Sequence, residues 1–363
     1  DFLNKVTIHQ ADWEHNLKIL LEDRERVKND NILSQQESVQ YPIDPEEVFL
    51  SAEISPFVNV IEDAKKHREY LLQSGKWDRR RSLFKDNQGK ITADISTKPL
   101  VEFPFNGDNQ DAPYLILEDI PDFKPPKYMY VASADFYKQE TATTTNSVCT
   151  VGVYKYPLAG DINSKKLVAT YAGRPKTYKE LNERVLMLLQ AYNAILLPEN
   201  EDLGVFQTYL EGLRLEEDFL EKHIDFNSAL AYSDNPARKW GYTPKQSKRK
   251  LIAMYANYLE ESVTIINDKG EEVNTKRIYT IDDIWLLSEI ISFSENGNFD
   301  RISGHIGAIG LLHVLEKNYI YPKGLLRKRD GEQTEEKPKK KEKKLSFYGN
   351  TSRQKSFYGN RRR

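Results

Sequence analysis

The sequence has 363 residues, 39% of them hydrophobic, which is enough to bury one large core or two ordinary ones. Its single cysteine, Cys149, excludes an internal disulfide and a thiolate zinc cluster and predicts a reducing compartment. No apolar run approaches the roughly 18 to 20 residues of a membrane-spanning helix, so we expect no membrane contact. Residues 322–363 carry 15 Lys and Arg against 5 Asp and Glu, which leaves 50 acidic against 38 basic residues in the remainder. This asymmetry excludes a protein that binds nucleic acid over its whole surface, and any such contact must be local.

The first 126 residues predict helices followed by loops and short strands. Trp13, Leu17 and Leu20 stand at helical spacing among charged residues, which predicts an amphipathic helix within residues 1–30. A second amphipathic helix is expected over residues 55–73. From residue 75 to 126 the chain is rich in Pro, Asp, Asn and Gly, which indicates loops and brief strands and a domain boundary near residue 124.

From residue 127 the pattern changes to strands. Apolar runs predict a three-stranded meander over residues 128–132, 147–156 and 166–171. A helix over residues 178–192 leads to the short apolar run 194–197, which we interpret as a buried strand parallel to the first. Helical patterns recur at residues 244–260, 281–293 and 302–316. This order of elements predicts an α/β layered domain.

The sequence from about residue 328 onward is rich in Lys and Glu and repeats one pentapeptide. Ser346-Phe-Tyr-Gly-Asn350 returns as Ser356-Phe-Tyr-Gly-Asn360 before three final arginines. Such a composition cannot support a packed core, so we expect disorder. The tail is either a solubilising end or an arm that binds DNA phosphates or a partner protein, because its aromatic residues could stack on bases.

Three acidic residues stand at the ends of predicted elements. Asp135 follows the first strand, Glu199 follows the strand at 194–197, and Asp300 begins a helix. If these two strands are parallel neighbours, Asp135 and Glu199 lie side by side at their carboxyl ends, where α/β sheets place their sites. Carboxylates are suitable ligands for Mg²⁺ or Mn²⁺, and two such ions about 3.5 to 4 Å apart can assist phosphodiester hydrolysis. The three residues are therefore a candidate metal centre.

Each of these residues also has a structural interpretation. Asp135 could simply open a polar loop, Glu199 is one of several neighbouring acids, and Asp300 is suited to capping a helix. His305 is more often a core or helix-surface histidine than a ligand. The sequence contains neither a G-x-x-x-x-G-K-[ST] phosphate loop nor an H-E-x-x-H zinc motif, which excludes those two chemistries.

Together these segments resemble the large terminase subunit of tailed bacteriophages, the DNA-packaging motor, in its C-terminal nuclease part. The resemblance covers roughly residues 35 to 320, and four marks carry it in the family's order: Tyr41-Pro-Ile-Asp-Pro-Glu-Glu-Val-Phe49, Tyr130-Val-Ala-Ser-Ala-Asp135, Leu196-Leu-Pro-Glu-Asn200 and Asn298-Phe-Asp300. The stretch Trp240-Gly-Tyr-Thr243, with its following lysines, also resembles the region between the second and third acids. The chain departs from the family in lacking a glycine turn after Asp135 and in having Phe299 and Arg301 around the third acid. The consequence would be either a weaker metal site or a substitute ligand, Asp283 or Glu289.

The resemblance implies an RNase H-like mixed sheet flanked by helices. It also implies a metal-dependent endonuclease that cuts double-stranded concatemeric phage DNA during genome packaging. Asp135, Glu199 and Asp300 would hold two Mg²⁺ or Mn²⁺ ions. The candidates for contacts to DNA phosphates are Lys138, Lys245, Lys248, Arg249 and Lys250. The expected partners are DNA, the portal protein, the small terminase subunit and the ATPase part of the same subunit, in the cytoplasm of the infected bacterial host and not in the mature virion.

The expected organisation has four parts. Residues 1–50 would be a helical remnant or linker from an ATPase part, 51–126 a connecting region of helix and loops, 127–321 the RNase H-like nuclease domain, and 322–363 a disordered basic tail. Two alternatives stay open. One is a catalytically inactive RNase H-like docking module of the motor, which Phe299 and Arg301 favour, and the other is a different RNase H-like nuclease such as a resolvase.

Overall fold

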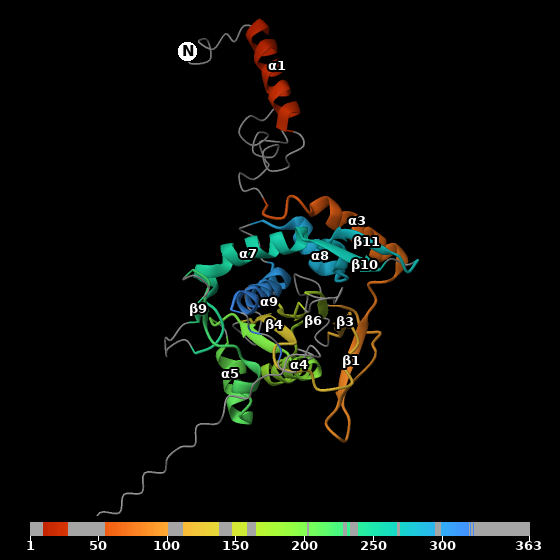
Figure 1. The fold of residues 1–363 in the computed structure, drawn as a ribbon, viewed down its shortest axis with the longest axis vertical. Helices are drawn as coiled ribbons and strands as arrows, with labels where there is room; N and C mark the ends of the chain where they lie inside the picture. Colours follow the sequence, from red (N-terminus) through yellow and green to blue (C-terminus); the bar gives the residue numbers. More distant parts are fainter. Residues whose placement is uncertain are drawn as a thin grey trace, which may run out of the picture. The chain divides into compact units, whose positions relative to one another are not determined.

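The structure is a computed structural model, and its described residues form most of the chain between Gln10 and Pro322 (Figure 1). The described ranges are 10–27, 55–100, 112–137, 147–157, 165–201, 203–227, 231–232, 239–266, 269–294, 299–318, and residues 320 and 322. The motif at residues 41–49, the candidate Lys138 and the tail beyond residue 322 lie outside these ranges. The elements from residue 55 to residue 318 belong to one compact unit.

Among the residues that the structure describes, two helices precede the sheet. The predicted N-terminal helix is α1 (Gln10–Val27), and the second amphipathic helix is α3 (Ile61–Ser74), which buries Ala64, His67 and Leu71. Among the described residues, no helix has both the length and the apolar character needed to cross a membrane.

A seven-stranded mixed sheet forms the centre of the molecule, in the order β2-β1-β3-β6-β5-β4-β7. The strands are β1 (Arg80–Lys85), β2 (Ile91–Ile95), β3 (Tyr114–Ile116), β4 (Tyr130–Asp135), β5 (Cys149–Lys155), β6 (Leu167–Gly173) and β7 (Ile195–Pro198). The predicted meander is confirmed as β4, β5 and β6, which pair antiparallel. The predicted buried strand is β7, and it pairs parallel with β4. The expected mixed sheet flanked by helices is confirmed.

The predicted division near residue 126 does not separate two folding units. Strands β1, β2 and β3 extend the same sheet, since Tyr114 in β3 pairs with Tyr171 in β6. Helix α3 packs against α8 (Ile284–Ser292) far along the chain. The three strands have only three to six residues and are separated by turn-forming residues, so local patterning could not assign them to the sheet.

Helices cover both faces of the sheet, and Figure 1 shows α4 (Tyr178–Tyr192) and α9 (Asp300–Lys317) on opposite sides. Side chains alternate along β4, so Ala132 and Ala134 join the core beneath α4, whereas Val131 joins the core around α9. By the same alternation Asp135 lies on the α9 face. In β7, Leu197 lies in the α9 core, which places Glu199 on that face as well.

Helix α9 lies close against the sheet because it has glycines where they meet. A Cβ atom on Gly304 would collide with the Thr150 side chain of β5, and one on Gly307 would collide with Ser133 of β4. The other side of α9 packs on α7 (Pro244–Glu260) and α8, so α9 is buried almost all round. This close packing brings the first residue of α9, Asp300, to the edge of the sheet.

Smaller elements complete the described fold. They are α5 (Gly204–Leu213), α6 (Glu216–Phe219), β8 (Ile224–Asp225), β9 (Ala231–Tyr232), β10 (Ser262–Ile266), β11 (Glu272–Lys276) and the 3₁₀ helix η2 (Arg277–Thr280). Strands β8 and β9 form one two-stranded ribbon, and β10 and β11 form another.

Candidate active site

The first two candidate acids lie side by side, as the sequence predicts. Ala134 of β4 pairs with Pro198 of β7 in parallel register, and the Glu199 amide donates to the Ala134 carbonyl at 3.3 Å. Asp135 and Glu199 are therefore neighbours at the carboxyl ends of adjacent strands, which lie about 4.8 Å apart in a sheet. Both residues are half-buried.

The third acid reaches the same edge from α9. The Val148 amide donates to Oδ2 of Asp300 at 2.8 Å, and the Thr150 hydroxyl donates to the Asp300 backbone carbonyl. Thr150 is also the residue that pairs with Asp135 across β4 and β5. Asp300 is 4% exposed. Three acids from segments far apart in the sequence thus meet at one edge and on one face of the sheet.

The strand order sets their arrangement. Strand β4 lies between β5 and β7, so Asp135 is the middle acid. Glu199 follows β7 on one side, and Asp300 is held over the start of β5 on the other. Asp135 is consequently the acid best placed to share a ligand with each of the other two.

Electrostatic effects on two buried neighbours agree with this convergence. Burial raises the pKa of the Cys149 thiol well above its usual value, and the negative charges of Asp135 and Asp300 raise it further. Burial likewise raises the pKa of Tyr242, with the charges of Glu199 and Asp135 adding to the effect. The Tyr242 hydroxyl donates to Oε1 of Glu199 at 3.0 Å.

Burial also raises the pKa of Asp300 itself to about 6, although the Val148 amide and the cation of Lys248 oppose the rise. Removing a carboxylate from water disfavours its charged form, and a bound cation would restore it. Oδ1 of Asp300 accepts no hydrogen bond from the described residues, so this oxygen is open to such a cation.

The residues fit hard divalent cations better than zinc. The donors are carboxylate oxygens, which suit Mg²⁺ or Mn²⁺, with no thiolate among them. Within the described ranges, no three His, Cys, Asp or Glu side chains form a ready-made ligand group for one ion. A two-ion centre needs fewer protein ligands for each ion, because one carboxylate is shared and water or phosphate oxygens supply the rest. The assignment of Asp135, Glu199 and Asp300 as ligands remains a prediction.

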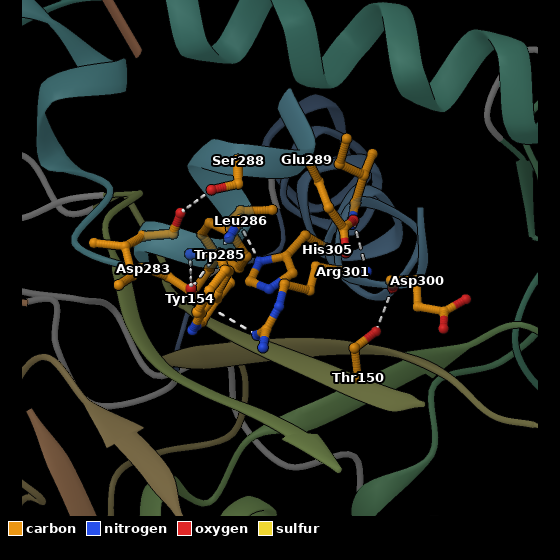
Figure 2. A network of polar contacts seen from close by, with 12 residues as sticks. Thr150, Tyr154, Asp283, Trp285, Leu286, Ser288, Glu289, Asp300, Arg301 and His305 are labelled. Carbon is orange, nitrogen blue, oxygen red and sulfur yellow. Dashed lines mark hydrogen bonds and ion pairs between the residues drawn. The ribbon is translucent and has the colours of Figure 1, made fainter. Parts of the chain in front are cut away.

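The two possible substitute ligands have structural roles (Figure 2). Asp283 is fully buried, accepts from the amides of Trp285 and Leu286 at the start of α8, and pairs with Arg301 at 3.3 Å. Oε2 of Glu289 accepts from the amides of Arg301 and Ile302 at 3.0 and 3.1 Å, which caps α9. Arg301, a departure from the family pattern, therefore connects α8 to α9, while the Asp300 side chain points away from this network.

His305 is a core residue, as the sequence interpretation favoured. It is fully buried, and its Nδ1 lies 2.7 Å from the Tyr154 hydroxyl. A Cβ atom on Gly152 would strike its ring, so this strand position accommodates only glycine without rearrangement. Burial lowers the pKa of His305 to about 4, which keeps the ring neutral at ordinary pH.

The predicted phosphate contacts within the described chain lie on the first half of α7 and are exposed: Lys245, Lys248, Arg249 and Lys250. Lys248 is close enough to Asp300 to lower its pKa. The Lys250 ammonium donates to the Phe226 carbonyl at 2.6 Å, which ties this side chain to the protein. The start of α7 adjoins the second acid, because the Tyr242 amide donates to the Pro198 carbonyl at 3.0 Å.

Sequence reasoning missed three residues that build the site. Thr150 links the first and third acids, Tyr242 binds the second, and Arg174 lies close to Asp300. Two signals were available: Arg174 comes three residues after a predicted meander strand, and Tyr242 lies in the stretch Trp240-Gly-Tyr-Thr243. That strand runs parallel to the first, so its carboxyl end belongs to the edge that carries Asp135.

The fold is similar to the large terminase nuclease domain of Thermus phage P74-26, with 16% sequence identity and a TM-score of 0.25, over 56% of this chain and 94% of that domain. It is also similar to the large terminase nuclease of the thermophilic phage G20c, with 15% identity and a TM-score of 0.22, over 52% of this chain and 92% of that one. No protein-family model matches the sequence, and no curated protein matches it. At these values the likeness concerns the fold, and we argue function from the residues of the chain itself.

Proposed function

We propose that this chain is a metal-dependent endonuclease that cuts double-stranded DNA. The observation that carries the proposal is the meeting of Asp135, Glu199 and Asp300 at one edge and on one face of the sheet. Two of these acids follow parallel strands, which is where α/β sheets place their sites. The third is buried with one oxygen anchored and the other open.

In the proposed mechanism the three acids would hold two Mg²⁺ or Mn²⁺ ions. Such ions supply a water of lowered pKa for attack on phosphorus and stabilise the leaving 3′ oxygen. Asp135, the middle acid, would be shared, with Glu199 and Asp300 each favouring one side. Tyr242 orients Glu199 through its hydroxyl, and the Val148 amide fixes one oxygen of Asp300.

The first half of α7 would bind the DNA backbone. Lys245, Lys248 and Arg249 are exposed there, and Lys248 also acts electrostatically on Asp300. Cutting without sequence recognition depends on phosphate contacts, which position the duplex without reading its bases. We expect binding to weaken steeply with salt and to weaken further when these cations are removed.

We further propose that the cutting serves bacteriophage genome packaging in the cytoplasm of the infected host. This role rests on the order of the four sequence motifs that resemble large terminase subunits. The portal protein, the small terminase subunit and an ATPase part of the same subunit would then be the partners.

The test is nicking of supercoiled plasmid by the purified chain with Mn²⁺ and without ATP. Asp135→Asn keeps the side-chain shape, and Asp218→Ala, an exposed aspartate in α6, is the matched control. We expect wild type and Asp218→Ala to nick and Asp135→Asn to be inactive. Equal nicking by Asp135→Asn would refute the assignment of the central acid.

The second candidate function is a docking module without catalytic activity. It is favoured by Phe299 and Arg301, the two departures from the family pattern around the third acid, because both side chains have packing roles inside the protein. The Phe299 ring lies 4.8 Å from that of Phe293, and Arg301 is paired inside the protein. A ligand that binds the folded state raises its melting temperature. A Mn²⁺-induced rise in melting temperature that disappears in Asp135→Asn supports the nuclease, and an identical response in both proteins supports the docking module.

A further inference from the structure

A buried arginine, Arg174, lies next to the candidate acids. It directly follows β6, which runs parallel to β4 because both strands pair antiparallel with β5. The carboxyl ends of β6 and β4 therefore share one edge of the sheet. Arg174 is 4% exposed, so its guanidinium is not a surface group that could receive a DNA phosphate.

Two of its contacts involve the segments that carry or hold an acid. The guanidinium lies over the ring of Tyr137, 4.1 Å from the ring centroid, and Tyr137 stands two residues after Asp135. One Nη1–H donates to the carbonyl of Ser147. Ser147 precedes Val148, whose amide binds Oδ2 of Asp300 at 2.8 Å.

The segment after β4 is supported further by α4. The Tyr137 ring stacks on Tyr178, the first residue of that helix, with centroids 5.7 Å apart. Arg174, Tyr137 and Tyr178 thus form one stack on the edge that carries the acids. Glu289 caps α9 directly after Asp300. Arg174 and Glu289 thus support two different segments next to the third acid.

We propose that Arg174 is a positioning residue that fixes the separation between Asp135 and Asp300. A charged donor bonded to a buried carbonyl is among the stronger hydrogen bonds, and a cation over a desolvated aromatic ring adds to it. Without the guanidinium, Ser147 and Val148 lose one anchor to the segment of Asp135, beside the pairing of β4 with β5. The consequence for metal binding rests on the proposed nuclease function, whereas the anchoring itself does not.

The single cysteine provides a direct reporter of this anchoring. Cys149 follows Val148 and is fully buried, and no other thiol exists in the sequence. The rate at which a thiol reagent labels the native protein therefore measures opening at the start of β5. Arg80→Ala is the matched control, because the Arg80 guanidinium also donates to backbone carbonyls, those of Thr97 and Lys98, and also lies over an aromatic ring, but it does so on β1.

We expect Arg174→Ala to be labelled at least about tenfold faster than wild type, the factor that corresponds to losing one charge-assisted hydrogen bond. Arg80→Ala should be labelled at close to the wild-type rate. Methylguanidinium added to Arg174→Ala should slow labelling again, and ethylammonium should not. Arg174→Gln provides a second variant if the alanine protein does not fold.

The functional part is measured as the Mn²⁺ concentration for half-maximal plasmid nicking. Residues that orient metal ligands typically change metal affinity about 10- to 100-fold when removed, so Arg174→Ala should need at least about tenfold more Mn²⁺. Arg80→Ala should need no more Mn²⁺ than wild type. Unchanged labelling in Arg174→Ala and Arg174→Gln overturns the proposal, and so does fast labelling with an unchanged Mn²⁺ requirement. If the wild type itself does not nick, the proposed nuclease function fails while the labelling rates still decide whether Arg174 anchors this edge.

Discussion

The first two acids and the third acid are positioned by different kinds of structure. Asp135 and Glu199 follow two paired strands, and backbone hydrogen bonds of the sheet set their separation. Asp300 begins a helix whose place depends on side chains: a carboxylate cap from α8, a buried ion pair and contacts to β5. The difference suggests that changes in side chains will displace the third acid long before they disturb the first two.

The largest loss of stability should come from replacing Asp283, which is buried and paired with Arg301. Asp283→Ala leaves a buried arginine without its partner and removes the cap of α8, so we expect a loss of about 3 to 5 kcal/mol in unfolding free energy. Urea denaturation followed by circular dichroism measures it. Nicking should fall as well, because α9 loses its connection to α8.

The adjacent residue provides the control for this prediction. Asp282 is partly exposed and lies 3.5 Å from His67, so Asp282→Ala should lose less than about 1 kcal/mol. The double variant Asp283→Asn with Arg301→Met keeps a cap and removes the buried charge, and it should recover most of the loss. A double variant as unstable as Asp283→Ala would show that the ion pair is not the source of the effect.

The contrast between strand pairing and side-chain contacts also explains which parts of the fold and the site the sequence could predict. Periodicity is a local property of the sequence, so α4 and α7 are predicted at their observed bounds. The expected parallel pairing of β4 with β7 also predicts that Asp135 and Glu199 are neighbours. Strands β1 to β3 were not assigned to the sheet because each is short and its partner is distant. Arg174 lies 37 residues after Tyr137 and 27 after Ser147, and no local pattern indicates such contacts.

A pH-dependent loss of stability should arise from His305, inside the α9 packing. Its pKa is lowered from 6.5 to about 4 by burial, with Asp283 opposing and Arg301 reinforcing the shift. The folded state therefore binds this proton less readily than the unfolded state, so the full stability is present above pH 6.5 and falls as pH decreases toward 4. The expected contribution is about 3 kcal/mol in full, of which about 2 kcal/mol is lost by pH 5.0.

Denaturation at pH 7.5, 6.0 and 5.0 measures this contribution. His305→Gln cannot take up the proton and should lose less stability than wild type over that range, even if it is less stable at pH 7.5. His313→Gln changes an exposed histidine of the same helix and should follow the wild-type curve. Parallel curves for wild type and His305→Gln would contradict the assignment.

The smallest expected loss of stability comes from Gly304→Ala, which tests most directly whether the third acid is displaced more easily than the first two. Gly304→Ala adds one methyl group where α9 touches Thr150, and overpacking of this kind is expected to lower stability by about 1 to 3 kcal/mol. Gly212→Ala in α5 meets open space and should be neutral or slightly stabilising, since alanine favours helix.

The same Gly304→Ala variant should also lose activity. Because its added methyl group pushes the start of α9 away from β5, Asp300 should move while β4 and β7 keep Asp135 and Glu199 in place. Nicking by Gly304→Ala should consequently fall at temperatures where the protein remains fully folded. Full activity in a folded Gly304→Ala protein would mean that the position of Asp300 tolerates displacement, and the third acid would then have no role in holding a metal ion.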